Sequence, residues 1–304
     1  MPKVIAGALL ALEVLFITSR AVRIVQGNDD GWAELYTRSF NDALRSSGHD
    51  VVLSAPAENQ SGTGATGRNS TRPDLNWVNS YPATAIKYGI EKFGPDLWGG
   101  KSPELAVSGP NVGPNLGSPV RQSGTVGAAV YAAHKAHIPA LAFSAPDAPR
   151  APWNTRPVPN RSVVYGDVAA AVTQEIIKSG KPYLPEDTFL NINLPKYGNG
   201  CNATSDFVFV LSRISKANSS REDVEWCKTK QLPWEKHVVH RSKCSVSISI
   251  GDASDKSPMN DVAKQKTVLD KLRKILTCFH EDGSYGTVTQ HKSPDGQQHQ
   301  LSNL

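Results

Sequence analysis

Two adjacent carboxylates are the feature of this 304-residue sequence with the clearest chemical meaning. Asp29 and Asp30 stand in the run Asn28-Asp29-Asp30-Gly31, two residues after the short β-branched segment 22–25. Like charges a few ångströms apart repel each other unless a cation lies between them. The pair therefore favours a divalent-metal site, and the alternative is a plain turn, because Asn, Asp and Gly are also common turn formers.

Neutral oxygen ligands are available in the loops that follow other apolar runs. Asn28, Ser61, Asn111 and Asn115 offer amide or hydroxyl oxygens there. Hard divalent cations such as Mg²⁺, Mn²⁺ or Ca²⁺ prefer these oxygens in combination with carboxylates. We expect one divalent metal ion in an all-oxygen site, with Mg²⁺ or Mn²⁺ as the first choices.

A third polar run precedes a predicted helix at 123–135 that is rich in small residues. Ser123, Gly124 and Thr125 would place hydroxyls and free backbone N–H groups at its start. Such a helix start favours binding of phosphate. The alternative is that Ser123 only caps the helix, as serine does at many helices.

Other catalytic chemistries find little support in the sequence. His49, His134 and His137 do not have the spacing of a zinc site, so we expect them on the surface or in packing. The sequence contains no G-x-S-x-G motif, and the first β-α turn contains no G-x-G-x-x-G motif. Serine-nucleophile hydrolysis and dinucleotide-dependent oxidoreduction are therefore disfavoured.

The elements that must position these residues form an α/β pattern. Strand 22–25, helix 33–46 and strand 49–55 make a β-α-β unit, whose strand-end loops share one edge of a sheet. Further strands are predicted at 105–108, 140–144, 188–194, 207–214 and 246–250, and further helices at 162–178 and 261–279. Segment 62–100 is predicted to be irregular, with at most a small hairpin. No linker divides the chain, so we expect one domain with C-terminal additions.

Composition bounds the class of protein. Hydrophobic residues make up 39% and charged residues 20%, which is typical of a globular protein. The net charge of +5 arises from 33 basic and 28 acidic residues that are mixed along the chain. No nucleic-acid polymer is expected as a partner, because no basic cluster stands out.

The ends of the chain predict secretion. Residues 1–21 read as a signal peptide, with Lys3 before an apolar stretch at 4–17 and small residues at Ser19 and Ala21. The apolar stretch is too short for a stable membrane span. From residue 281 to 304 the chain is polar and is predicted to be a disordered tail.

Cysteines and glycosylation motifs agree with an extracellular location. Four cysteines without metal-site spacing predict two disulfides, and sequence proximity favours Cys201–Cys227 and Cys244–Cys278 among three possible connectivities. Asn-x-Ser/Thr motifs of a glycoprotein begin at Asn59, Asn69, Asn160, Asn202 and Asn218.

Four motifs together resemble the SurE-like phosphatase/nucleotidase family in order and spacing. They are NDDG at 28–31, VVLSAPAENQSG at 51–62, SGPNVGPNLG at 108–117 and SGTVGAA at 123–129. The similarity runs from about residue 24 to 280. The signal sequence and paired cysteines look like the secreted fungal-type branch, often called acid phosphatase.

The resemblance implies a fold, an activity and residue roles. The fold is a Rossmann-like three-layer sandwich with a mostly parallel sheet, spanning 22–280. The activity is hydrolysis of phosphate monoesters, commonly nucleoside 5′- or 3′-monophosphates, through a metal-bound water oriented or deprotonated by Asp29 or Asp30. The implied metal ligands are Asp29, Asp30, Ser61 and Asn111, and the implied phosphate-binding residues are Asn28, Asn115, Ser123, Gly124 and Thr125. Family members are frequently dimers, which makes a homodimer an expectation.

The sequence departs from the family pattern at two places. Gly27 stands where Thr or Ser is usual, and Arg121-Gln122 stands where an aromatic or apolar residue is usual. Arg121 would bind phosphate or lie in solvent. The glycosylation motif that begins at Asn59 includes Ser61, an implied metal ligand, so Asn59 is expected to carry no glycan. The alternative function is a non-catalytic protein that binds a metal or a phosphate ligand on the same scaffold.

Overall fold

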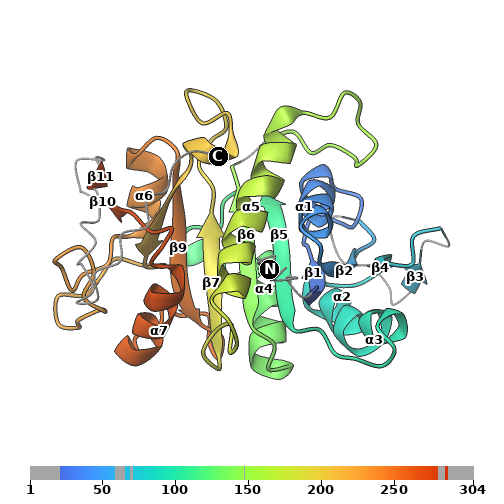
Figure 1. Cartoon of the computed structure of the whole chain (residues 1–304), viewed down its shortest axis with the longest axis horizontal. Helices are drawn as coiled ribbons and strands as arrows, with labels where there is room; N and C mark the ends of the chain where they lie inside the picture. Colours follow the sequence, from blue (N-terminus) through green and yellow to red (C-terminus); the bar gives the residue numbers. More distant parts are fainter. Residues whose placement is uncertain (1–20, 59–65, 69–70, 147, 280–284, 287–304) are drawn as a thin grey trace, which may run out of the picture.

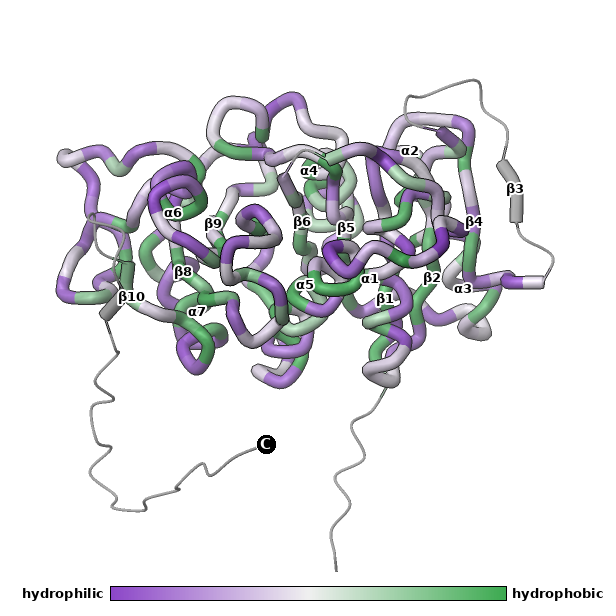
Figure 2. The backbone as a smooth tube through the Cα atoms, turned by 90° about the horizontal axis from the view of Figure 1, so that it is seen from above, coloured by the Kyte–Doolittle hydropathy of each residue, from purple (hydrophilic) through white to green (hydrophobic). Residues whose placement is uncertain are grey.

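A twisted sheet of nine strands crosses the molecule in the computed structural model, which describes residues 21–58, 66–68, 71–146, 148–279 and 285–286. The strand order is β3-β4-β2-β1-β5-β6-β7-β9-β8, and Figure 2 shows the molecule from above with β3 at one end and β8 towards the other. The strands are β1 Arg23–Gly27, β2 Asp50–Pro56, β3 Thr66–Arg68, β4 Leu75–Val78, β5 Leu105–Val112, β6 Ala140–Ala145, β7 Thr188–Asn193, β8 Val208–Ser212 and β9 Ser245–Asp252.

Most neighbouring strands are parallel. The central set from β4 to β7 is parallel throughout, and β3 pairs antiparallel with β4. Strand β9 runs antiparallel to β7, and β8 runs parallel to β9. The prediction of a mostly parallel α/β sheet is confirmed, and the carboxyl ends of β1, β2, β5, β6 and β7 lie at one edge.

Helices cover both faces of the sheet, which makes three layers (Figure 1). On one face, α1 Leu35–Ser46, α5 Asn160–Lys178 and α7 Val262–Leu272 share an apolar core with the strands. On the other face, α2 Pro82–Tyr88 and α4 Gly124–Val130 pack against the small residues of β5 and β6. The remaining elements are η1 Gly89–Phe93, α3 Gly94–Leu97, η2 Ser118–Arg121, η3 Tyr131–Lys135, η4 Thr204–Asp206, α6 Glu235–Arg241, β10 Cys278–Phe279 and β11 Tyr285–Gly286.

Two segments differ from the sequence-based expectation. Segment 62–100 was predicted to be irregular, but it contains β4, which pairs in parallel with β2, and α2, which buries Ala85 and Ile86. The helix predicted at 261–279 ends at Leu272. The chain then turns so that Leu276 bridges to Phe209 and Cys278 reaches its disulfide partner.

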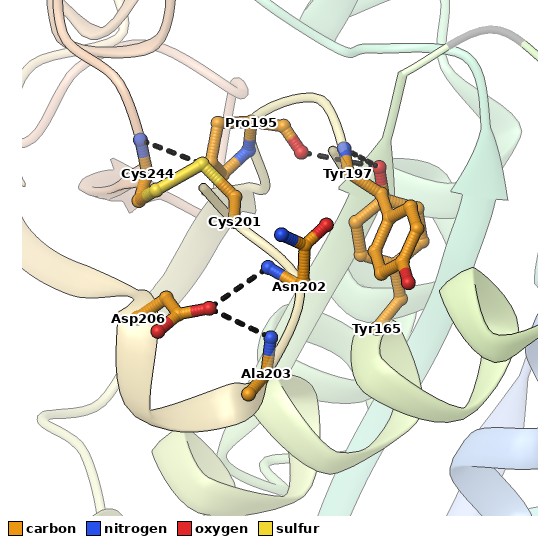
Figure 3. Close-up of a disulfide and its surroundings, with 8 residues drawn as sticks. All are labelled: Tyr165, Pro195, Tyr197, Cys201, Asn202, Ala203, Asp206 and Cys244. Atoms are coloured by element: carbon orange, nitrogen blue, oxygen red, sulfur yellow. Dashed lines mark hydrogen bonds between the residues drawn. A yellow bond between two sulfur atoms is a disulfide. The ribbon is translucent and has the colours of Figure 1, made fainter. Parts of the chain in front are cut away.

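Two disulfides join Cys201 to Cys244 and Cys227 to Cys278. The pairing expected from sequence proximity, Cys201–Cys227 and Cys244–Cys278, is therefore wrong. Cys201 follows β7 in a turn. Asp206 stabilises this turn by accepting the backbone N–H groups of Asn202 and Ala203 (Figure 3). That turn lies beside the start of β9, where Cys244 stands, because β7 and β9 are sheet neighbours.

Several expectations concern residues outside the described part of the chain. They are the signal peptide predicted at 1–21 except for its last residue, the ligand Ser61, the motifs at Asn59 and Asn69, and most of the tail after 280. Among the helices that the structure describes, none has the length and apolar character needed to cross a membrane.

Candidate functional site

The acidic loop leaves the sheet at the carboxyl end of β1. Asn28 stabilises the turn by donating from Nδ2 to the carbonyl oxygen of Gly31, which has a φ of +104° that glycine adopts readily. The other amide atom, Asn28 Oδ1, is buried and has no hydrogen-bond donor among the described residues. The turn predicted for this run is present, and it leaves a buried oxygen available to a ligand.

Asp30 points inward from this loop and is held by two elements. One carboxylate oxygen accepts the N–H of Val112 at the end of β5, at 2.6 Å. The other accepts from Arg150, at 2.8 Å from Nε and 2.6 Å from Nη2. The side chain of Asp30 is 1% exposed, and burial raises its pKa although Val112 and Arg150 act in the opposite direction.

Asp29 lies against the first turn of α4. A Cβ atom on Gly124 would stand 2.5 Å from Oδ1 of Asp29, so glycine is required for this approach. Burial raises the pKa of Asp29, and the neighbouring charge of Asp30 raises it further. The facing N–H of Gly124 and the charge of Arg150 lower it.

Asn111 comes from an irregular stretch of β5 next to the acidic loop. The register with β6 shifts between Ser108 and Asn111. The amide of Asn111 is oriented from both sides, because Nδ2 donates to the Gly113 carbonyl at 2.8 Å and Oδ1 accepts from Thr125 Oγ1 at 3.2 Å. The oxygen of Asn111 therefore faces the start of α4.

Asn115 is more deeply placed than a surface phosphate ligand. It is 7% exposed, and its Nδ2 donates to Ser144 Oγ at 2.8 Å. Its backbone N–H donates to Asn193, and its carbonyl oxygen accepts from Asn191 and Asn193. These contacts fix the backbone of the loop that contains Asn111 and Asn115.

Ser123 caps α4, as the alternative interpretation expected. Its Oγ accepts the N–H of Val126 at 3.1 Å. The helix continues without interruption from α4 into η3, which ends at Lys135. The N–H groups of the first turn, including that of Gly124, face the acidic loop.

The structure thus brings together most of the residues singled out from the sequence. Asp29, Asp30, Asn111, Gly124 and Thr125 meet at the carboxyl edge of β1 and β5, with Asn28 directly behind them. Asn115 lies deeper, Ser123 serves as a cap, and Ser61 is outside the described residues.

Two charged residues at the site were missed in the sequence. Arg150 lies in the loop after β6 and pairs with Asp30. Its position after a predicted strand was the one feature of the sequence that pointed to this edge of the sheet. Glu34 caps α1 by accepting the N–H groups of Tyr36 and Thr37. Burial raises the pKa of Glu34 to about 7, and the nearby charge of Asp30 contributes to this shift.

The two departures from the family pattern have structural explanations. At Gly27 a Cβ would lie 3.2 Å from Cδ1 of Ile86, so α2 fills the space that a larger residue would need. Arg121 is exposed at the end of η2, and its carbonyl oxygen accepts from Lys256. The histidines have structural contacts: His49 with Val22 and Gln174, His134 with Asp187, and His137 with Glu186.

The chemistry of the donors fits a hard cation. Asp30 is buried and Asp29 is half-buried, both carboxylates have raised pKa values and lie side by side, and Asn28 Oδ1 has no donor among the described residues. A divalent cation would favour their ionised form. Within the described ranges no three His, Cys, Asp or Glu side chains form a metal-binding group, so a cation here would need neutral oxygens in addition to two carboxylates.

This fold and site define a three-layer α/β protein with a paired-carboxylate loop at the carboxyl edge of its sheet. The family model described as survival protein SurE matches residues 24–221, and the chain belongs to this family. A solved structure, the SurE protein from Aquifex aeolicus, has a TM-score of 0.56 and 22% identity, and covers 82% of this chain and 98% of that one. This likeness shows the shared fold.

Curated relatives match about three-fifths of the chain. An acid phosphatase of Yarrowia lipolytica is 31% identical over 206 residues, which are 58% of this chain and 57% of that protein. The 5′-nucleotidase SurE of Aquifex aeolicus is 30% identical over 177 residues, covering 55% and 63%. The 5′-nucleotidase SurE of Geobacter metallireducens is 33% identical over 181 residues, covering 57% and 65%. The matches thus span less than two-thirds of these relatives' lengths.

Proposed function

We propose that this protein is a secreted, divalent-metal-dependent phosphomonoesterase that hydrolyses nucleoside monophosphates or other small phosphate monoesters. The observation that carries the proposal is the meeting of Asp29, Asp30, Asn111 and the first turn of α4 at one edge of the sheet. Membership of the SurE family and the names of the acid phosphatase and 5′-nucleotidase relatives support it.

The proposed metal ligands are Asp29, Asp30 and Asn111, together with Ser61 from outside the described residues. When bound, the cation would neutralise phosphoryl oxygens and make a water molecule more acidic. Asp29 is the better candidate for orienting that water or accepting its proton, because Asp30 already accepts hydrogen bonds from Val112 and Arg150.

Positive groups around the loop would bind the substrate phosphate. Arg150 is half exposed above Asp30, and a guanidinium group at this position would attract a phosphate through charge and charge-assisted hydrogen bonds. The N–H groups at the start of α4 face the same space, and the buried hydroxyl of Thr125 donates to Asn111 beside it. These groups would stabilise the charge that develops on the transferred phosphoryl group.

Secretion and glycosylation belong to the same proposal. The two disulfides support secretion, because disulfides form and persist in oxidising compartments. Asn202 and Asn218 are exposed and lie within described loops, so they are the preferred glycan positions, and Figure 3 shows Asn202 beside the first disulfide. Asn160 is less suited, because its amide donates to Tyr197 at 2.9 Å. The domain limits of 22–280 and a homodimer remain predictions.

The test is phosphate release from p-nitrophenyl phosphate and nucleoside monophosphates with Mg²⁺, Mn²⁺ or EDTA. We expect turnover that requires the metal and that Asp29→Asn lowers by at least about 100-fold, because a ligand and a proton acceptor are lost together. Asp167→Asn is the matched control, since Asp167 is exposed on α5 away from the site.

Three outcomes would contradict parts of the proposal. Wild-type protein that is folded and binds Mn²⁺ and phosphate without releasing phosphate from any ester would support the non-catalytic alternative. Full turnover in the presence of EDTA would show that the reaction does not require a metal ion. Equal turnover of Asp29→Asn and Asp167→Asn would place the chemistry elsewhere.

A further inference from the structure

A buried carboxylate lies behind the loop that contains Asn111 and Asn115. Glu235 is the first residue of α6 and is fully buried. Its Oε1 accepts the backbone N–H of Gly117 at 2.6 Å. Its Oε2 accepts from Asn191 Nδ2 at 3.0 Å and from Ser249 Oγ at 2.7 Å. All three donors come from segments distant in sequence, so Glu235 connects α6 with β7, β9 and the loop after β5.

The sheet register explains how this connection reaches the site. Asn111, Ser144, Asn193 and Ser247 stand opposite one another on neighbouring strands from β5 to β9. Asn191, Ser249 and Ser212 form a second row. Because residues two apart on a strand share a face, both rows lie on the same face of the sheet. A polar band therefore runs across the sheet between the proposed metal ligand Asn111 and the position of Glu235.

The loop from Asn111 to Gly117 is held by this band at two points. Asn193 and Ser144 bind Asn115, and Asn191 donates to both the carbonyl oxygen of Asn115 and the carboxylate of Glu235. Glu235 then binds the N–H of Gly117, a residue with a φ of +73°. Without Glu235, that N–H would lose its acceptor and the end of the loop would lose its anchor.

We propose that Glu235 is a positioning residue for binding of the substrate phosphate: it holds the Asn111–Gly117 loop, and with it the proposed metal ligand Asn111 and the start of α4, which follows this loop through η2. The inference rests on the proposed function. Residue 235 lies beyond the segment 24–221 matched by the family model, so this contact is made by a part of the chain outside that match.

The contact is independent of the charge on Glu235. Burial raises the pKa of Glu235 to about 8, while its three donors act in the opposite direction. When protonated on Oε2, the group can donate to Ser249, whose hydroxyl lies 2.9 Å from that of Ser212. Oε1 still accepts from Gly117 in both states, so glutamine at position 235 can keep this contact and donate to Ser249, while its amide nitrogen gives up only the hydrogen bond from Asn191.

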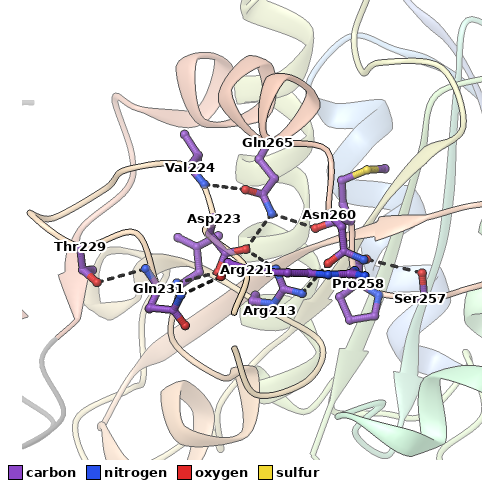
Figure 4. Close-up of polar contacts among 12 residues, drawn as sticks. Arg213, Arg221, Asp223, Val224, Thr229, Gln231, Ser257, Pro258, Asn260 and Gln265 are labelled. Carbon is purple, nitrogen blue, oxygen red and sulfur yellow. Dashed lines mark hydrogen bonds and ion pairs between the residues drawn. The ribbon is translucent and has the colours of Figure 1, made fainter. Parts of the chain in front are cut away.

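The test compares three variants. Glu235→Met keeps the length of the side chain but removes both acceptors, and Glu235→Gln keeps the acceptor for Gly117. Asp223→Leu is the matched control: Asp223 is also buried, accepts from Arg213 and Gln265 (Figure 4) and from the N–H of Leu232, and none of these hydrogen bonds is made to the Asn111–Gly117 loop. The measurements are KM and kcat for p-nitrophenyl phosphate, inhibition by inorganic phosphate, and amide hydrogen exchange of peptide 113–121.

Glu235→Met is expected to raise KM and the inhibition constant of phosphate about tenfold, with a smaller change in kcat, and to speed exchange in peptide 113–121 about tenfold. Glu235→Gln is expected to remain within about twofold of wild type, since it repeats the contact. Asp223→Leu is expected to lower the melting temperature without changing KM, phosphate inhibition or exchange of this peptide.

The proposal is overturned if Glu235→Met matches Asp223→Leu in every measurement, or if Glu235→Gln exchanges the peptide as fast as Glu235→Met. Hydrogen exchange separates this inference from the proposed function. If the wild type neither binds nor releases phosphate, the proposed function fails, and the exchange comparison still decides whether Glu235 holds the loop.

Discussion

The contact between Gly124 and Asp29 gives the most direct test of the site geometry. In Gly124→Ala the new Cβ would stand 2.5 Å from Oδ1 of Asp29, whereas ordinary contacts begin at 3.4 Å. The carboxylate must therefore move by about 0.9 Å. A misplacement of about 1 Å at a reacting group lowers the rate about 100-fold, which corresponds to about 2.7 kcal/mol.

The same helix offers a matched control. At Gly127 a Cβ would meet only Nζ of Lys256, at an ordinary 3.6 Å. Gly127→Ala is expected to keep wild-type activity and to gain about 0.5–1 kcal/mol from helix propensity. Gly124→Ala is expected to fold with a melting temperature near that of wild type, because the Asp29 side chain can rotate away.

The assay measures kcat/KM for p-nitrophenyl phosphate with Mn²⁺, the affinity for Mn²⁺ by calorimetry, and the melting temperature of both variants. We expect Gly124→Ala alone to lose activity and metal affinity. If Gly124→Ala keeps both at the wild-type level, Asp29 is not a metal ligand held by α4 and the reasoning is refuted. If Gly127→Ala loses as much activity, the effect belongs to the helix and not to Asp29.

Two further predictions concern stability. Cys227→Ser with Cys278→Ser removes a bridge that spans 51 residues and is expected to lower the free energy of unfolding by about 4 kcal/mol, as measured by denaturant titration. The raised pKa of Glu235, about 8 against an ordinary 4.5, means that unfolding releases a proton between these values. Wild-type stability is therefore expected to fall by up to about 4 kcal/mol between pH 5 and pH 8, and Glu235→Gln to show a weaker fall in melts over that range.

Each of these two predictions has its own control. Peptide mapping under non-reducing conditions should recover Cys201 linked to Cys244 in the double-serine variant, and a Cys201–Cys227 link in the wild type would contradict the observed pairing. For Glu235, the control is the pH dependence of stability in both proteins. If the stability of wild type and of Glu235→Gln falls equally with pH, ionisation of Glu235 is not linked to folding.

Strand periodicity and strand-end loops were sufficient to predict the central fold. Apolar runs such as 51–53 and 140–143 predicted strands that are buried in the parallel sheet. Because parallel strands place their carboxyl ends at one edge, Asp29, Asp30 and Asn111 could be expected to meet before any contact was known. Gly124 could be placed near them for the same reason, since its helix follows β5.

Other features depended on tertiary contacts that local patterns do not contain. The alternation in β9 normally indicates one solvent-exposed face, but Ser247 and Ser249 are fully buried, with Ser249 beneath Glu235 of α6. The pairing of Cys201 with Cys244 depends on the adjacency of β7 and β9, two strands that are far apart in the sequence. Arg150 could not be assigned to Asp30, because the loop after β6 has no motif of its own.

The order of the cysteines along the chain gives the two disulfides an interleaved arrangement. Cys227 lies inside the loop closed by Cys201–Cys244, and Cys244 lies inside the loop closed by Cys227–Cys278. A single proteolytic cut anywhere between residues 201 and 278 therefore leaves the two fragments covalently joined. Between residues 227 and 244, where Glu235 stands, both bridges span the cut. A protein nicked there would separate into two pieces only after reduction of both bonds.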